Sequence, residues 1–171
     1  MNRTLSRLSL VVSLVLVAAA VPAKGQSASH ADAEKQIVAL ERTLTDAVAK
    51  HDMAPFKANV AADAMQIDAA TGIGKVFTPD FETFIKTVSI QSQAIDSSRF
   101  LWVNDNTVLH LHRWSGKGSY QGQPLPSPTW VSTLWTNKSG KWQALFHQET
   151  VAMAPPAAAP KAAAKAPAGK K

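Results

Sequence analysis

Residues 129–151 read TWVSTLWTNKSGKWQALFHQETV. Two apolar, aromatic-rich runs flank the polar turn Asn137-Lys138-Ser139-Gly140, a pattern typical of a β-hairpin. It is the most strongly specified local structure in the chain. Strand alternation predicts that one face of this hairpin carries Val131, Thr133, Trp135, Trp142, Ala144, Phe146 and Gln148.

The 40 or so residues before the hairpin also indicate strands. Residues 90–103 predict a long strand with a bulge around Ser97-Ser98, and residues 107–114 predict the strand that returns from a turn at 104–106. Residues 116–128, rich in Gly and Pro, predict a long loop. The second half of the chain is therefore expected to be β.

The first half alternates helix and short strand. Asp32 can cap a helix that runs to about residue 50, with Glu41 and Arg42 expected on the side away from the core. The apolar stripe of this helix has spacings of three and four residues and comprises Ile37, Leu40, Leu44 and Val48.

Two further helix starts follow. Asp52 can cap a short helix that carries Pro55 in its first turn, and Thr78-Pro79 opens another helix that ends near Ser89. Between them, residues 65–68 predict a short strand and residues 69–76 a Gly-containing loop. The resulting order, α-α-β-α-β-β-β-β, predicts an α+β fold in which the helices pack on one face of a curved antiparallel sheet.

The two ends of the chain are expected to lie outside this domain. Residues 1–23 combine Arg3 and Arg7 with an apolar run and Val21-Pro22-Ala23, as in a cleaved secretory signal. Residues 24–31 are expected to be a linker, 32–152 the domain, and 153–171, almost wholly Ala, Pro, Lys and Gly, a disordered tail. We therefore expect a periplasmic or secreted protein without disulfides, because the chain has no cysteine.

Charge argues against a nucleic-acid-binding domain. The whole chain carries a formal charge of +6, with 18 basic and 12 acidic residues. Two of the basic residues lie in 1–23 and four in 153–171, which leaves 12 of each sign between them. A formally neutral domain does not indicate the clustered Lys and Arg that nucleic acids require.

The order of elements and several short motifs resemble the nuclear transport factor 2-like superfamily, which includes ketosteroid isomerase-like and SnoaL-like proteins. The resemblance covers about residues 32–152. It is carried by His51-Asp52, Asp63, Thr78-Pro79, Gly140-Lys141-Trp142 and Gln148-Glu149-Thr150. The similarity is greatest to small bacterial domains of unassigned function.

This resemblance implies a cone-shaped, cystatin-like curved sheet with the N-terminal helices on its concave face, a pocket between them, and a homodimer. Enzymes of the superfamily often place an acid or base on the inward face of the final hairpin. In this chain those positions are Thr133 and Gln148, neither of which titrates near neutral pH. The resemblance thus favours a pocket over catalysis.

The leading hypothesis is an exported domain that binds a small apolar or aromatic molecule without a cofactor. Its pocket would be lined by Trp102, Trp135 and Phe146, with Thr133 and Gln148 as polar contacts. The alternative for these aromatic side chains is an ordinary core.

Two histidines one residue apart, His110 and His112, point to the same side of one strand and could share a metal ion. No third ligand is evident, although His147 is a candidate, so no metal is predicted. With a tight two-residue turn at 104–106, the histidines would lie on the outer face with Leu101 and Arg99. Phe100, Trp102, Leu109 and Leu111 would then form the core face.

Two other functions stay open. An isomerase, dehydratase or cyclase would use Asp68 or His110 as its base. An interaction module would instead use the outer face of the sheet, with the Lys/Ala/Pro tail as a tether to the cell envelope.

Overall fold

The structure is a computed structural model that describes residues 24–68 and 72–153. Its elements are, in order, α1 (Lys24–Ala49), α2 (Ala54–Asn59), β1 (Val60–Asp68), β2 (Gly72–Lys75), α3 (Pro79–Thr87), β3 (Ser89–Asn104), β4 (Thr107–Tyr120), β5 (Gln123–Pro124), β6 (Thr129–Lys138) and β7 (Lys141–Val151). The expected α+β architecture is confirmed. The expected signal and tail lie outside the described residues, and the domain boundaries stay predictions.

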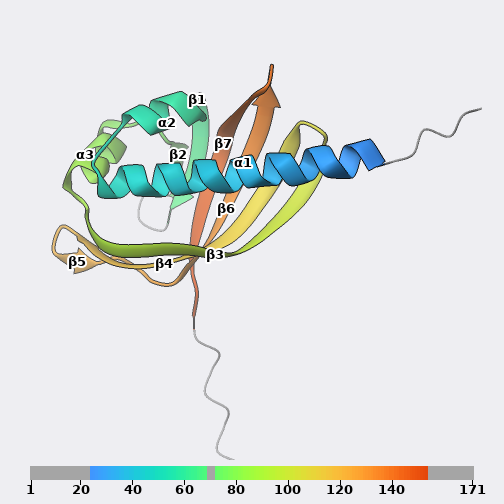
Figure 1. Cartoon of the computed structure of the whole chain (residues 1–171). Helices are drawn as coiled ribbons and strands as arrows, with labels where there is room; N and C mark the ends of the chain where they lie inside the picture. Colours follow the sequence, from blue (N-terminus) through green and yellow to red (C-terminus); the bar gives the residue numbers. More distant parts are fainter. Residues whose placement is uncertain (1–23, 69–71, 154–171) are drawn as a thin grey trace, which may run out of the picture.

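One curved sheet forms a single layer, and α1 lies across its concave face, as Figure 1 shows. The strand order is β2-β1-β7-β6-β4-β3, with β5 pairing β4 at one end. The sheet is open and mixed, because β1 runs parallel to β7. The expectation of a purely antiparallel sheet was therefore wrong for the β1–β7 pair.

Several local expectations are confirmed by hydrogen bonds. The Phe81 amide donates to Thr78 Oγ1 at 3.1 Å, which caps α3. At the start of α2 the expectation was wrong by one residue, because the N-cap is Met53 and has no side-chain cap, although the Ala54 amide donates to Asp52 Oδ1 at 2.9 Å. The β6–β7 turn places Ser139 and Gly140 at φ 53° and 84°, the left-handed conformation that a tight hairpin turn requires.

Four boundaries differ from expectation. Strand β1 begins at Val60 rather than at residue 65. Helix α1 begins at Lys24 rather than Asp32. Part of the expected loop at 69–76 is β2, which pairs with β1. Strand β4 continues to Tyr120 and pairs with β5, within the region expected as a loop at 116–128. In each case pairing or packing extends an element beyond the residues with favourable local sequence.

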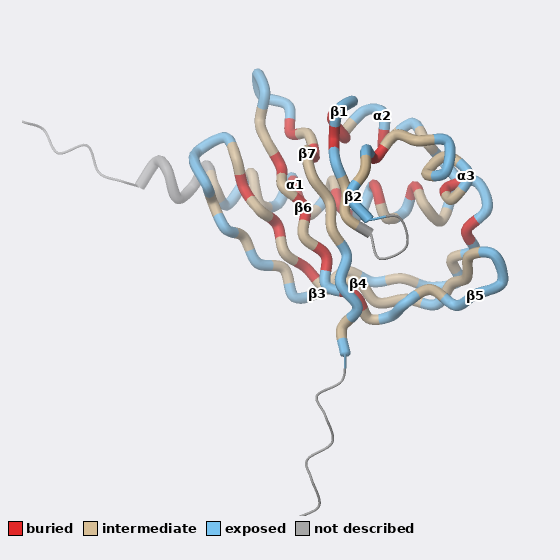
Figure 2. Tube along the Cα trace, turned by 180° about the vertical axis from the view of Figure 1, so that it is seen from behind, coloured by how far each residue is buried: buried red, intermediate tan, exposed pale blue. Residues whose placement is uncertain are grey.

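The core lies between α1 and the concave face. Ile37, Val108 and Trp135 are completely buried within it. Figure 2 shows buried positions alternating with less buried ones along β4 and β6, as expected when one face is covered. None of the helices in the described ranges is long and apolar enough to cross a membrane.

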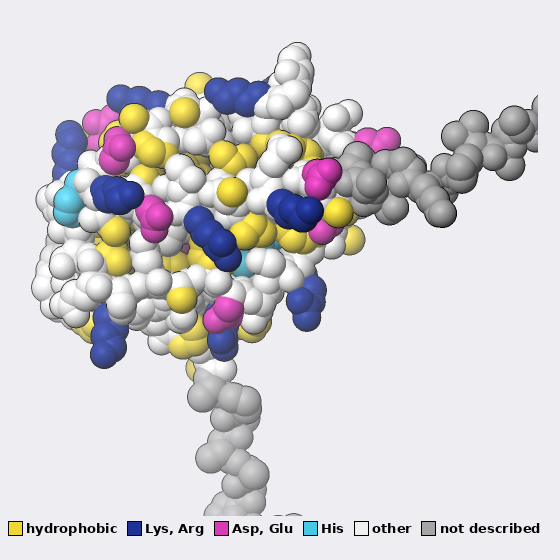
Figure 3. Space-filling model, in the orientation of Figure 1, with side chains coloured by type: hydrophobic (Ala, Val, Ile, Leu, Met, Phe, Trp, Pro, Cys, Tyr) yellow, Lys and Arg dark blue, Asp and Glu magenta, His cyan; other side chains and the backbone are white. Residues whose placement is uncertain are grey.

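The surface over α1 carries charges of both signs, scattered rather than gathered, as Figure 3 shows. This face therefore offers no clustered basic patch of the kind that nucleic acids require.

Candidate functional site

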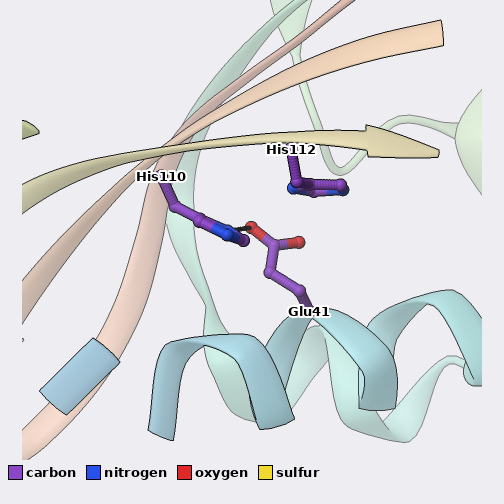
Figure 4. Close-up of side chains that lie close together, drawn as sticks. All are labelled: Glu41, His110 and His112. Carbon is purple, nitrogen blue, oxygen red and sulfur yellow. Dashed lines mark hydrogen bonds and ion pairs between the residues drawn. The ribbon is translucent and has the colours of Figure 1, made fainter. Parts of the chain in front are cut away.

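A carboxylate and two imidazoles meet in the core between α1 and β4. Glu41 extends from α1 toward the sheet, and His110 and His112 extend from β4 toward the helix (Figure 4). Their residues are 5%, 0% and 2% exposed. One ligand-type atom from each residue lies within 4.8 Å of the others. We call these three residues the Glu-His-His cluster.

Glu41 lies on the buried stripe of α1, which corrects the expectation that it faces away. It follows Ile37 by four residues and precedes Leu44 by three, and both neighbours are buried. This is the i, i+4, i+7 spacing of one helix face. The spacing therefore carries the signal, although the residue type favours the surface, because Glu is rarely buried without a partner.

The carboxylate of Glu41 has such partners. Its Oε1 accepts a hydrogen bond from Trp135 Nε1 at 2.9 Å and lies 3.3 Å from His110 Nδ1. Burial alone would raise the pKa of Glu41, but the hydrogen bond from His110, the charge of His112 and the hydrogen bond from Trp135 together lower it to about 2. Glu41 is thus a carboxylate at neutral pH.

His110 is held on both sides of its ring. Its Nδ1 faces Glu41, and its Nε2 lies 3.2 Å from Ser98 Oγ. The ring stacks on Phe100 with centroids 4.6 Å apart and on His112 with centroids 4.8 Å apart. These contacts fix the position of the ring. Ser98 Oγ can pair with Nε2 whether that nitrogen donates or accepts, because a serine hydroxyl does both.

His112 differs from its neighbour. Its Nδ1 is buried and has no hydrogen-bond partner among the described residues. Burial is the main cause of a pKa lowered to about 4, and the charges of His110 and His147 act in the same direction against Glu41 and Glu149. A neutral imidazole nitrogen thus lies in the core without a partner.

The placement of both histidines on the concave face corrects the expectation of an outer face. The turn is the tight one that the outer-face assignment assumed, because Asn104 pairs with Thr107. A register shift between Trp102 and Asn104 then inserts Val103, so that Trp102 pairs with Val108 and Phe100 with His110. One extra residue exchanges the two faces of a strand.

The bulge expected at Ser97-Ser98 is confirmed. The register shifts between Asp96 and Arg99, and Ser97 adopts φ 58°. Ser98 consequently faces His110. A β-bulge therefore supplies one of the contacts that position the cluster.

Another bulge changes which side chains of the final strand face the core. Leu134 pairs with Phe146 but Trp135 pairs with Ala144, so β7 contains an extra residue at Leu145. Phe146 and Gln148 therefore lie on the face opposite Thr133 and Trp135, and the expectation that they share one face was wrong. His147 and Glu149 take their places on the concave side.

Beside the cluster, Thr133, His147 and Glu149 form a row of polar side chains that leads toward solvent. Its Nδ1 lies 3.4 Å from Thr133 Oγ1 and its Nε2 lies 3.3 Å from Glu149 Oε1. Partial burial opposes its protonation, but the hydrogen bond and charge of Glu149, with the charge of Glu41, raise its pKa. The side chains of His147 and Glu149 are 36% and 55% exposed. The row therefore connects the cluster to the surface.

The structure divides the five expected ligand-binding residues between the two faces of the sheet. Trp135 and Thr133 are packed in the core, and Trp135 donates to Glu41. Trp102 lies near the start of α1, where it donates to Glu34 Oε1 at 2.9 Å and stacks on His30. The side chain of Asp68, an expected base, lies outside the described part of the chain.

Two surface hollows have other linings. One of about 350 Å³ is formed by α1 and the tip of the β6–β7 hairpin, and one of about 170 Å³ lies at the end of α1. Neither lining includes the Glu-His-His cluster or the five expected residues. The cluster is closed in this conformation, because its three residues are at most 5% exposed.

No family model and no curated protein matches the chain. Several solved structures match the chain, at low sequence identity. An NTF2-like protein from Cytophaga hutchinsonii aligns with a TM-score of 0.62 and 16% identity over 69% of this chain and 97% of its own. The hexachlorocyclohexane dehydrochlorinase LinA type 2 gives 0.57 and 12% over 76% and 98%. The association domain of C. elegans CaMKII gives 0.56 and 15% over 70% and 96%. The chain therefore has the fold of the NTF2-like superfamily.

Proposed function

We propose that this domain is an enzyme that removes a proton from a small neutral molecule, with His112 as the base. The observation that carries the proposal is the buried Nδ1 of His112, which has no partner among the described residues and lies in a cluster with an ionised carboxylate. Leaving a buried nitrogen unpaired destabilises a fold, and such groups are often functional.

The surroundings support a role in proton transfer. A C–H bond of the substrate would break as a bond forms between the proton and His112 Nδ1. The electron pair would pass to a neighbouring carbonyl or to a leaving group on the substrate. The carboxylate of Glu41 would stabilise the resulting imidazolium, as a fixed charge does in a water-poor site.

Ser98 and Trp135 would hold this arrangement in place. Trp135 fixes one oxygen of Glu41, and Ser98 fixes the far side of the His110 ring. The half-exposed His147–Glu149 pair marks the side from which a substrate would enter, and entry requires side chains to move because the cluster is closed. The likeness to a dehydrochlorinase is consistent with this class of reaction but shows the fold alone.

The test uses a generic carbon acid, 5-nitrobenzisoxazole, which opens to a coloured phenolate when a base takes its ring proton. In the presence of EDTA, we expect the wild-type protein to turn it over at least ~100-fold faster than His112→Asn, the loss typical of a missing general base. Glu41→Gln should also be slow.

His51→Asn is the matched control. His51 has φ 57°, which Asn tolerates, and its Nδ1 contacts the carbonyl oxygen of Ile85, which is not a member of the cluster. This variant should keep the wild-type rate. Equal rates in wild type and His112→Asn, with both proteins folded, contradict the proposal.

We also propose that the protein is exported and forms a homodimer. The sequence of residues 1–23 supports export, and mass spectrometry of the protein from its native host should find a chain that begins at Lys24. Recovery of only the chain with Met1 contradicts export.

The proposed homodimer is supported by large apolar side chains that are exposed on β3 and β6. Leu101, Val103 and Trp130 are 61%, 64% and 48% exposed. Sedimentation should give twice the monomer mass for the wild type and the monomer mass for Leu101→Asp. A wild-type monomer at micromolar concentration contradicts this proposal.

A further inference from the structure

We propose that Glu41, His110 and His112 form a binding site for one divalent transition-metal ion. The inference uses the same side chains as the proposed function, but it does not require the protein to be an enzyme. Three observations on the described residues carry it: the donor set, its spacing, and the buried nitrogen of His112 that lacks a partner.

The donor set selects the kind of ion. Two imidazoles and one carboxylate suit Zn²⁺, Ni²⁺, Co²⁺ or Fe²⁺, whereas Mg²⁺ and Ca²⁺ prefer sites made only of oxygen. The sequence supplied the two histidines one residue apart but left the third ligand unidentified. The structure supplies it from α1, 69 residues earlier in the chain.

The spacing is close to what one ion requires. Zinc ligands lie about 2.0–2.2 Å from the metal, so two of them can be at most about 4.4 Å apart. The donor atoms of the three residues all lie within 4.8 Å of one another. Small side-chain rotations are therefore enough to close the site around an ion.

An ion would also offset the cost of burying two polar groups of the cluster. It would give His112 Nδ1 the partner that it lacks and would balance the buried charge of Glu41. No cavity is needed, because an ion is small enough for a closed cluster.

The outer contacts of the ligands can be kept when an ion binds. If His110 binds the ion through Nδ1, its Nε2–H donates to Ser98 Oγ, which lies 3.2 Å away. Trp135 Nε1 continues to donate to Glu41. Metal ligands characteristically have such outer hydrogen bonds, which fix the tautomer of a histidine and the orientation of a carboxylate.

The test uses untagged, EDTA-treated protein, because an added polyhistidine tag would bind the same ions. Titration with ZnCl₂ by calorimetry, with elemental analysis after dialysis, should give one Zn²⁺ per chain. CoCl₂ should give a visible absorption spectrum of a low-symmetry Co²⁺ complex. Glu41→Gln and His112→Asn should each weaken Zn²⁺ binding at least ~100-fold.

Two control variants separate this site from surface histidines. His147→Gln and His51→Asn should bind Zn²⁺ as the wild type does. Binding that persists in both cluster variants, that is lost in His147→Gln, or that needs millimolar Zn²⁺ overturns the inference. If Glu41→Gln does not fold, His112→Asn still decides, because it removes a buried nitrogen that has no partner.

The enzyme proposal and the metal-site proposal can be rejected independently of each other. If both are right, Zn²⁺ occupies His112 Nδ1 and the rate with 5-nitrobenzisoxazole falls as the ion is added to EDTA-treated protein. If the protein binds no Zn²⁺ but its rate with 5-nitrobenzisoxazole depends on His112, only the metal site is rejected. Stoichiometric Zn²⁺ binding by a protein without that rate rejects the enzyme alone.

Discussion

Trp135 donates a hydrogen bond from Nε1 to Glu41 Oε1 at 2.9 Å, and it does so from a side chain with no exposed surface. This contact joins β6 to α1 across the core. It also aligns the only carboxylate of the Glu-His-His cluster. The indole therefore acts both as the largest fully buried side chain and as the partner of a buried charge.

Trp135→Phe should destabilise the protein by about 1.5–3 kcal/mol, because a hydrogen bond to a charged group is lost while most of the aromatic packing remains. It should also raise the pKa of Glu41. Chemical denaturation at pH 7 measures the first effect. Trp102→Phe is the matched control, since its Nε1 donates to Glu34 at a less buried place. An equal loss in both variants would show that the burial of Glu41 adds nothing.

The sequence predicted the fold because local signals agreed with the final structure. The aromatic-rich hairpin, the Thr78 cap and the bulge at Ser97-Ser98 each depend on residues close together in the chain. The helix stripe of Ile37 and Leu44 was likewise visible as a spacing of apolar residues.

The cluster could not be assembled in the same way, because two single-residue insertions decide which side chains face inward. Val103 shifts the register of β3 against β4, and Leu145 shifts β6 against β7. Neither residue has a local sequence signal for a bulge. The strands were therefore predicted correctly, but the faces predicted for His110 and Gln148 were wrong.

Gly140→Ala should destabilise the hairpin by about 1–2 kcal/mol. Gly140 has φ 84°, and a side chain there costs about that much in the left-handed conformation although the added Cβ would meet no atom within 4 Å. Gly74→Ala is the control, because its added Cβ also meets open space but its φ is not positive. Thermal denaturation should therefore separate the two variants. Equal melting temperatures would contradict the role of backbone conformation.

Thr78→Ala should cost about 1 kcal/mol, since it removes the side chain that accepts from the Phe81 amide at the start of α3. Thr83→Ala tests a hydroxyl of the same helix that bonds to a carbonyl one turn earlier, on an exposed position. That variant should change stability by less than about 0.5 kcal/mol. Urea denaturation compares them, and a larger loss for Thr83→Ala would contradict the capping role.

The stability of the metal-free protein should rise with pH between about 4 and 6.5. His112 has a pKa of about 4 when folded and the ordinary value of 6.5 when unfolded. The unfolded chain therefore binds more protons in this window, and acidification through it favours unfolding. This difference between the folded and unfolded pKa of His112 contributes about 3 kcal/mol to the free energy of unfolding. The contribution is fully present above pH 6.5 and is lost as the pH falls to about 4.

The groups that face His112 are Glu41 from α1, His110 from its own strand, and His147 and Glu149 from β7. Glu41 keeps its charge through the window because its folded pKa is about 2. The raised pKa of His147 acts in the opposite direction and at higher pH, because the stability that it contributes is fully present below about pH 6.5 and is lost above it. Urea denaturation in EDTA at half-unit pH steps should therefore show a flatter profile between pH 4 and 6.5 in His112→Asn, whereas His147→Gln should change the profile only above pH 6.5. An unchanged profile in His112→Asn would exclude the buried neutral imidazole as the source of the pH dependence.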